Sequence, residues 1–274
     1  MNPMINFPGK FGIKAGIILA CVLSPAVMPE HGLCRDADPV FSSDQDIREF
    51  YSQISELVEQ SWKIWQDDIV LNNVEINGGR GRMSPGGMTG PVMTARKILR
   101  GLKGKDIPAG RMKCFRAAAE AISDSMREWQ RGYCHENIPF PEGSSSSFSL
   151  TPCVNVPVSV GSGYSSGSRK ITEDSLYDHM IYRGPSDDES ARPVFLAVSR
   201  AFIKGFKEWE KSCFIEGIKA SGGFAPAPGP MGMGPGPVKG AKGSGGKLTG
   251  AYFSGGVMYD HLASPASRGG PSGS

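Results

Sequence analysis

Three segments of the chain align without a gap: YSQISELVEQSWKIWQDDIVLNNVEINGG (residues 51–79), FRAAAEAISDSMREWQRGYCHENIPFPEG (115–143) and FLAVSRAFIKGFKEWEKSCFIEGIKASGG (195–223). Each segment carries a tryptophan at the same place, and apolar residues lie 3, 7, 11 and 14 positions before it. Intervals of three and four residues place these side chains on one face of an α-helix. The aligned tryptophans are Trp65, Trp129 and Trp209.

The alignment predicts an internal repeat with three units, residues 43–107, 108–187 and 188–274. Each unit is expected to be an amphipathic helix followed by an irregular Gly/Pro-rich loop, with room for short strands, and the third unit ends in a Gly/Pro-rich tail. Such a unit cannot bury its own apolar face, so units must stack on one another or oligomerise. The expected fold class is therefore mainly α, built as three serial helix-plus-loop repeats.

The loops that follow the predicted helices have an unusual composition. Residues 83–95, 144–168 and 224–238 contain no charged side chain and are rich in Gly, Pro, Ser, Met and Val. A solvated linker normally carries Lys, Glu or Asp, so two interpretations stay open: contact with another subunit or partner, or a flexible linker. The candidate contact residues are Met88, Val92, Val154, Val158, Met231 and Val238.

A Tyr-Asp-His element occurs twice, at residues 177–179 and 259–261. An aspartate can orient a histidine that acts as a general base. Adjacent side chains diverge on a helix or a strand, however, and no Ser or Cys nucleophile recurs at a fixed distance from both copies. The element is therefore expected to serve packing, and we predict no catalytic, cofactor-binding or metal-binding residue.

The N-terminus has the pattern of a secretory signal peptide over residues 1–26. Lys10 and Lys14 precede an apolar run that begins at Ala15, and small residues end it, so cleavage after Ala26 is predicted. Two other interpretations are a buried or membrane-tethering N-terminal helix and a lipoprotein with lipid on Cys21. We expect an exported protein that is periplasmic, at the cell surface or extracellular.

Export permits disulfides, but the number of cysteines does not require them. Five cysteines follow Cys21, which leaves one thiol over if the others pair. They are equally consistent with small buried apolar residues. These cysteines are Cys34, Cys114, Cys134, Cys153 and Cys213.

The charge of the chain excludes one class of partner. A net charge of +3 on 274 residues is too small to indicate a nucleic-acid-binding protein. The stretch 96–113 is nonetheless basic. It is expected to be either a solvated helix face or a surface for an acidic partner or anionic lipid headgroups.

Together these features predict an exported, non-enzymatic structural protein of a multi-subunit surface, envelope or particle assembly. The repeated helices would pack, and the uncharged loops would contact other subunits. A binding module whose loops engage a membrane or a partner protein is the main alternative, and a viral or phage-like particle component is another. No cofactor and no small-molecule substrate are expected.

Overall fold

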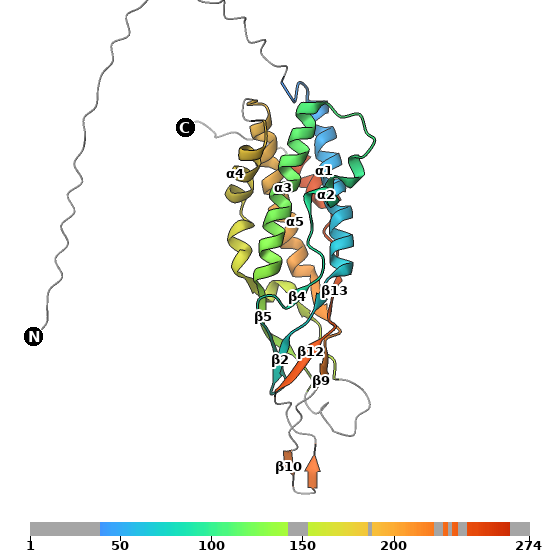
Figure 1. Cartoon of the computed structure of the whole chain (residues 1–274), viewed down its shortest axis with the longest axis vertical. Coiled ribbons are helices and arrows are strands. Elements are labelled where there is room, and N and C mark those ends of the chain that lie inside the picture. The colour runs from blue at the N-terminus through green and yellow to red at the C-terminus, as the bar shows by residue number, and fades with distance from the viewer. Residues whose placement is uncertain are drawn as a thin grey trace, which may run out of the picture. The chain divides into compact units, whose positions relative to one another are not determined.

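A computed structural model describes residues 39–141, 153–185, 188–221, 227–229, 232–234 and 240–263, all within the compact unit 38–274. These residues form six α-helices, three short 3-10 helices and thirteen strands. Three helices are long and three are short. The strands lie beyond the ends of the long helices (Figure 1).

The long helices are α1 (Asp44–Asp68), α3 (Ala109–Gly132) and α5 (Ala191–Ser212), and they lie side by side (Figure 1). The predicted start of the first helix near Ser43 is confirmed, because the Ser43 hydroxyl accepts a hydrogen bond from the backbone N–H of Asp46 at 3.2 Å. Each long helix ends three residues after its aligned tryptophan, and the chain then becomes extended.

The three aligned tryptophans meet in one core. Their ring centroids lie 6.4 Å apart for Trp65 and Trp129, 5.8 Å for Trp65 and Trp209, and 5.7 Å for Trp129 and Trp209. None of the three side chains is more than 2% exposed. The apolar faces of α1, α3 and α5 are thus buried against each other inside a single chain.

Polar contacts of the three tryptophans link the long helices in a cyclic order, and two of these contacts are hydrogen bonds. Trp65 Nε1 donates to Gln130 Oε1 at 2.9 Å, and Trp209 Nε1 donates to Gln66 Oε1 at 2.8 Å. The Trp129 N–H lies near the Glu210 carboxyl but does not meet hydrogen-bond geometry with it. In each pair the acceptor residue directly follows the tryptophan of another long helix, so the contacts run from α1 to α3, α3 to α5 and α5 to α1.

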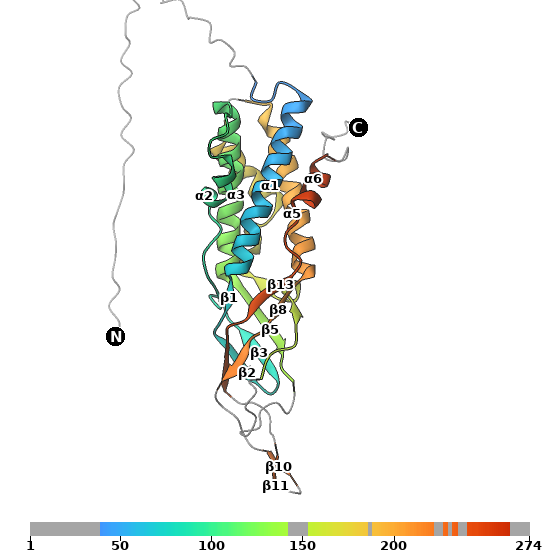
Figure 2. The ribbon, with the colours of Figure 1, turned by 90° about the vertical axis from the view of Figure 1, so that its right-hand side faces the viewer.

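The three short helices cover the grooves between the long ones. Helix α2 (Ala95–Ile98), continued by the 3-10 helix η1 (Leu99–Leu102), contacts α1 and α3. Helix α4 (Glu173–Arg183) contacts α3 and α5, and α6 (Gly255–Ala263) contacts α5 and α1 (Figure 2). The Tyr-Asp-His elements lie on α4 and α6.

The strands form antiparallel sheets in which distant parts of the chain pair. The largest sheet has the order β7-β5-β3-β2-β12-β9, a second has the order β13-β8-β6, and β1 with β4 and β10 with β11 form two-stranded pairs. The first group of bounds is β1 Val70–Leu71, β2 Val74–Asn77, β3 Arg80–Met83, β4 Met88–Thr89, β5 Tyr133–Pro139, β6 Val158–Ser159 and β7 Tyr164–Ser165. The second group is β8 Cys213–Glu216, β9 Lys219–Ser221, β10 Ala227–Gly229, β11 Gly232–Gly234, β12 Ala241–Ser244 and β13 Lys247–Gly250.

Glycines allow the close approach of strands at the centre of the six-stranded sheet. A Cβ atom at Gly81 would lie 2.7 Å from Phe140 and 2.8 Å from Val74. A Cβ atom at Gly243 would lie 2.6 Å from Ile218. Both glycines are buried, so their lack of a side chain leaves the space that these apolar neighbours fill.

The predicted fold class is wrong, because the structure is a mixed α and β fold rather than a mainly helical chain of serial repeats. The segments expected as irregular loops supply β4, β6, β7, β10 and β11, and part of β3. Of these strands, β4 pairs with β1, β6 with β8 and β7 with β5, whereas β10 and β11 pair with each other. The similarity of the three segments therefore produces one interleaved core in place of separate stacked units.

Several sequence predictions concern residues outside this description. The predicted signal peptide, residues 1–26, lies outside the described residues, as do Cys21 and Cys34. Within the described residues, no helix has the length and apolar character needed to cross a membrane. The remaining four cysteines, Cys114, Cys134, Cys153 and Cys213, are buried.

Candidate functional site

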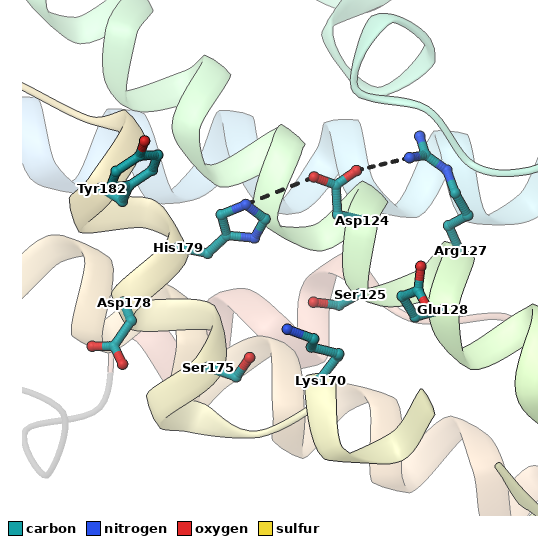
Figure 3. Close-up of a pocket in the computed structure, with 9 residues that line it drawn as sticks. All are labelled: Asp124, Ser125, Arg127, Glu128, Lys170, Ser175, Asp178, His179 and Tyr182. Carbon is teal, nitrogen blue, oxygen red and sulfur yellow. Dashed lines mark hydrogen bonds and ion pairs between the residues drawn. The ribbon is translucent and has the colours of Figure 1, made fainter. Parts of the chain in front are cut away.

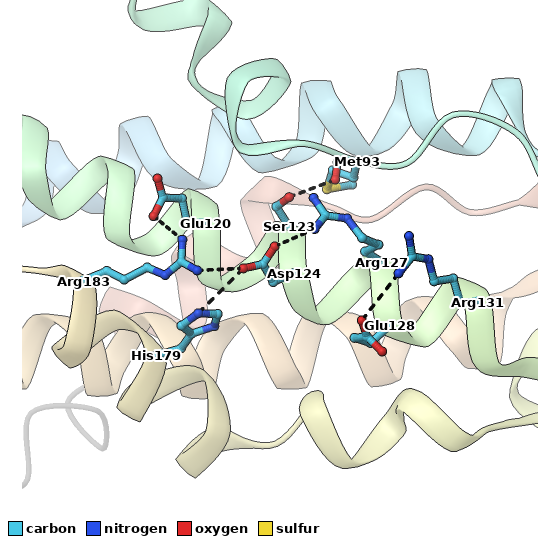
Figure 4. A network of polar contacts seen from close by, with 9 residues as sticks. All are labelled: Met93, Glu120, Ser123, Asp124, Arg127, Glu128, Arg131, His179 and Arg183. Carbon is cyan, nitrogen blue, oxygen red and sulfur yellow. Dashed lines mark hydrogen bonds and ion pairs between the residues drawn. The ribbon is translucent and has the colours of Figure 1, made fainter.

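The densest group of charged contacts lies between α3 and α4. Helix α3 presents Glu120, Asp124 and Arg127 at intervals of four and three residues, so they share one face. Helix α4 presents His179 and Arg183, one turn apart, toward that face (Figure 4). Two helices from different parts of the chain thus place five ionisable side chains together.

Asp124 is the centre of this network. Its carboxylate lies 3.2 Å from Arg183 Nη2, 3.1 Å from Arg127 Nη1 and 3.7 Å from His179 Nε2. Arg183 also contacts Glu120, at 2.6 Å through Nη1. One guanidinium therefore bridges two carboxylates on successive turns of α3, which fixes α4 against it.

The electrostatics keep His179 neutral. Burial lowers the pKa of His179, the nearby Arg183 lowers it further, and the negative charge of Asp124 only partly opposes both effects. The pKa of Arg183 is raised, chiefly by its hydrogen bond to Glu120. At neutral pH the site therefore holds a neutral imidazole beside two charged guanidinium groups.

A pocket of about 630 Å³ opens beside this network, between α3, α4 and the 3-10 helix η3 (Ser166–Lys170). Its lining includes Arg127, Lys170, Asp178 and His179, so it carries charges of both signs (Figure 3). His179 points toward Asp124, whereas Asp178 points away from it (Figure 3). The adjacent Asp and His side chains therefore do not act together.

The second Tyr-Asp-His element makes an analogous contact. His261 Nε2 on α6 lies 3.4 Å from Glu208 Oε1 on α5. Tyr177 and Tyr259 are half-buried and pack against the core. In both copies the histidine contacts a carboxylate of a long helix, which is what a packing element requires.

No family model, curated protein or solved structure matches the chain. The function must therefore be argued from the residues and their geometry alone. Among the described residues, no group of three His, Cys, Asp or Glu side chains is placed to hold a metal ion.

A second candidate site is a groove of about 890 Å³ on the surface formed by α2, η1 and α3. Its polar lining consists of five exposed cations and one half-buried carboxylate. These residues are Arg96, Lys97, Arg100, Lys103, Arg116 and Glu120. The basic stretch seen in the sequence thus forms a concave surface together with one turn of α3.

A third candidate surface is the end of the six-stranded sheet that lies farthest from the helices. The backbone N–H of Phe140 donates to the Gly79 carbonyl at 2.8 Å, and the N–H of Gly240 donates to Asn77 Oδ1 at 2.8 Å. Phe140 precedes the uncharged stretch 144–168, and Gly240 follows the uncharged stretch 224–238. Both stretches therefore adjoin the β2–β3 turn.

Cys153, within the stretch 144–168, and Ser221, which precedes the stretch 224–238, lie in the same sheet. Ala220 N–H donates to the Cys153 carbonyl at 2.8 Å, and Ser221 pairs with Lys242 of β12. Residues before and within the uncharged stretch 144–168, and residues on both sides of the uncharged stretch 224–238, thus lie in this part of the sheet. We call the residues around the β2–β3 turn, Phe140, Cys153, Ser221 and Gly240 the sheet end.

The predicted site residues fall into three groups. Trp65, Trp129 and Trp209 are core residues, and Met88 joins them in the core at 3% exposed. Val92 and Val158 are half-buried, whereas Val154 is 37% exposed. The last two predicted contact residues, Met231 and Val238, lie outside the described residues.

Sequence reasoning missed the ion-pair network because its members are far apart in the chain. Arg183 and Glu120 are separated by 63 residues. The helical spacing of the α3 charges and of His179 with Arg183 is visible in the sequence. Nothing in the sequence, however, states that these two faces meet.

Proposed function

We propose that this chain is an exported, non-enzymatic assembly protein whose sheet end contacts other subunits or a partner. The observation that supports it most directly is that residues beside or within two of the three uncharged stretches, 144–168 and 224–238, lie at the sheet end. A single contact surface on a rigid sheet holds its residues in a fixed arrangement for binding, which three separate loops would not do.

The closed helical core favours a contact at this end over a contact between helices. Because α1, α3 and α5 bury their apolar faces against each other, helix packing does not require a second subunit. This supports a contact at the sheet end, with the helices as its support. The sequence had left open whether the helices stack within one chain or oligomerise.

Exposed apolar side chains accompany the convergence. Val154 and Val156 are 37% and 46% exposed. The backbone of Val154 forms a bridge with Lys219 of β9, and the N–H of Val156 donates to the Pro139 carbonyl at 2.8 Å. Both valines thus lie beside the sheet end, where contact with another molecule would remove their side chains from water.

The test compares two double variants that add the same charge. Val154→Asp/Val156→Asp introduces charge beside the sheet end, and Ile64→Asp/Tyr182→Asp introduces it at exposed apolar positions on helices. Light scattering after size exclusion should show large species for the native chain and the helix variant. The sheet-end variant should be a folded monomer, because desolvating two carboxylates opposes contact. A native chain that is always monomeric, or a sheet-end variant that assembles normally, would contradict the proposal.

Export is tested separately. N-terminal sequencing of the protein from the culture fluid or the cell envelope should show a chain that begins after Ala26. A chain that keeps Met1 and remains in the cytoplasm would refute the export proposal without affecting the contact surface.

A further inference from the structure

We propose that the groove on α2, η1 and α3 binds an acidic segment of a polypeptide. This interaction is additional to the sheet-end contact, because the groove lies on the helical part of the structure. The proposal starts from its lining, which combines five cations with a single carboxylate in a space of about 890 Å³.

The described part of the chain offers the cations of the groove no carboxylate partner. Within the described residues, none of the side chains of Arg96, Lys97, Arg100, Lys103 and Arg116 forms an ion pair. The one carboxylate of the lining, Glu120, is already held by Arg183 at 2.6 Å. The groove therefore keeps a strongly positive surface that favours an anionic partner.

The positions of the cations suit a ligand with several anionic groups. Arg96, Arg100 and Lys103 follow one another at intervals of four and three residues along α2 and η1, and Arg116 faces them from α3. Three of the five cations are arginines, whose planar guanidinium groups bind carboxylates with two parallel hydrogen bonds. A row of Asp or Glu side chains can engage these groups in succession.

The groove also offers apolar surface for the rest of a peptide. Ala95 and Leu99 belong to its lining and are half-buried, so they can contact the aliphatic parts of a bound chain. A concave surface favours a narrow chain over a flat bilayer. A single-stranded nucleic acid would be expected to stack on aromatic side chains, and the lining contains none.

The experiment measures fluorescence anisotropy of a labelled oligoglutamate peptide titrated with the full chain. A neutral Gly-Ser peptide, phosphatidylglycerol vesicles and an oligothymidine of similar length are the comparison probes. The native chain should bind oligoglutamate, bind it more weakly as ionic strength rises, and leave the Gly-Ser peptide free. Tighter binding of the vesicles or the oligothymidine than of oligoglutamate would overturn the choice of a polypeptide.

Matched variants locate the binding. Arg100→Glu/Arg116→Glu should weaken oligoglutamate binding by about tenfold or more. Lys204→Glu/Lys211→Glu, which changes the net charge equally at exposed positions of α5 outside the groove, should bind like the native chain. Arg100→Gln/Arg116→Gln removes the two charges without reversing them and should also weaken oligoglutamate binding. This variant provides the test if the Glu variant does not fold. Equal affinity of the groove variants and the control would refute the proposal.

Discussion

Glu210 is a partly buried acid in the hydrogen-bonding region of the tryptophan core. Burial raises its pKa to about 7 from the ordinary value of 4.5, although the Trp129 N–H and Lys207 both lower it. The folded chain therefore holds a proton that the unfolded chain releases above pH 4.5. This contribution to stability is complete below that pH and is lost as the pH rises through 7.

The first prediction concerns this decrease of stability with rising pH. The free energy of unfolding should fall by about 2 kcal/mol between pH 5 and pH 8 through Glu210 alone. Glu210→Gln should remove this part of the pH dependence and stabilise the chain at pH 8, as measured by urea unfolding at several pH values. The control Glu75→Gln, at an exposed strand position, should leave the pH profile unchanged. An unaltered profile in Glu210→Gln would contradict the prediction.

The second prediction concerns the buried hydrogen bond from Trp65 to Gln130. Gln130→Leu leaves the indole N–H buried without an acceptor, so the free energy of unfolding should fall by about 2 kcal/mol. Adding Trp65→Phe removes the unpaired donor, and the double variant should lose less than the sum of the two single variants. Gln60→Leu on the exposed face of α1 should cost little. Strict additivity would show that this hydrogen bond does not stabilise the fold.

At the level of elements, the third prediction tests the glycines of the sheet. A methyl group at Gly81 or Gly243 meets apolar side chains at less than 3 Å, so Gly81→Ala and Gly243→Ala should each destabilise the chain by about 1–3 kcal/mol. Gly256→Ala in α6 is the control, because the nearest atom to its added Cβ lies 3.5 Å away. Thermal unfolding followed by circular dichroism measures all three. Unchanged stability in both sheet variants would mean that the strands can separate freely.

The helices could be predicted from the sequence, and the strands could not. The spacing of Tyr51, Ile54, Val58, Trp62 and Trp65 specifies one face of a helix by local geometry alone. Strand β12 (Ala241–Ser244) has no β-branched residue and consists of Ala, Lys, Gly and Ser, so its local sequence resembles a loop. It becomes a strand because a distant partner supplies its hydrogen bonds, and this pairing is not written in the local sequence.

For the candidate sites too, local features could be predicted from the sequence and long-range contacts could not. The basic side chains around Arg100 are close in sequence, so the charge of the groove was visible, but the contribution of Arg116 depends on packing between η1 and α3. The uncharged stretches were also visible. Their convergence follows from the pairing of β12 with β2 and β9, which joins residues more than 160 positions apart in the first case.

At the scale of the whole molecule, the fourth prediction tests whether the chain folds as one unit. Strand β12 lies between β2 and β9, and α6 packs against both α1 and α5. Deleting residues 241–274 removes an inner strand and one side of the helical layer, so the remainder should fail to fold cooperatively. Deleting only 264–274, which lies outside the described residues, should leave the fold intact. Circular dichroism melting distinguishes the results, and a stably folded chain after the longer deletion would disprove a single interleaved core.

The place of β12 in the sheet also determines when, during synthesis, the sheet can be completed. A ribosome adds about 5–20 residues per second from the N-terminus onward, so α1 and β2 are made long before the strand that fills the gap beside them. The nascent chain therefore lacks a closed sheet until almost all of it has been synthesised. Under the export proposed above, such a late closing step would keep the chain unfolded during passage through the membrane, and the core would be completed on the far side.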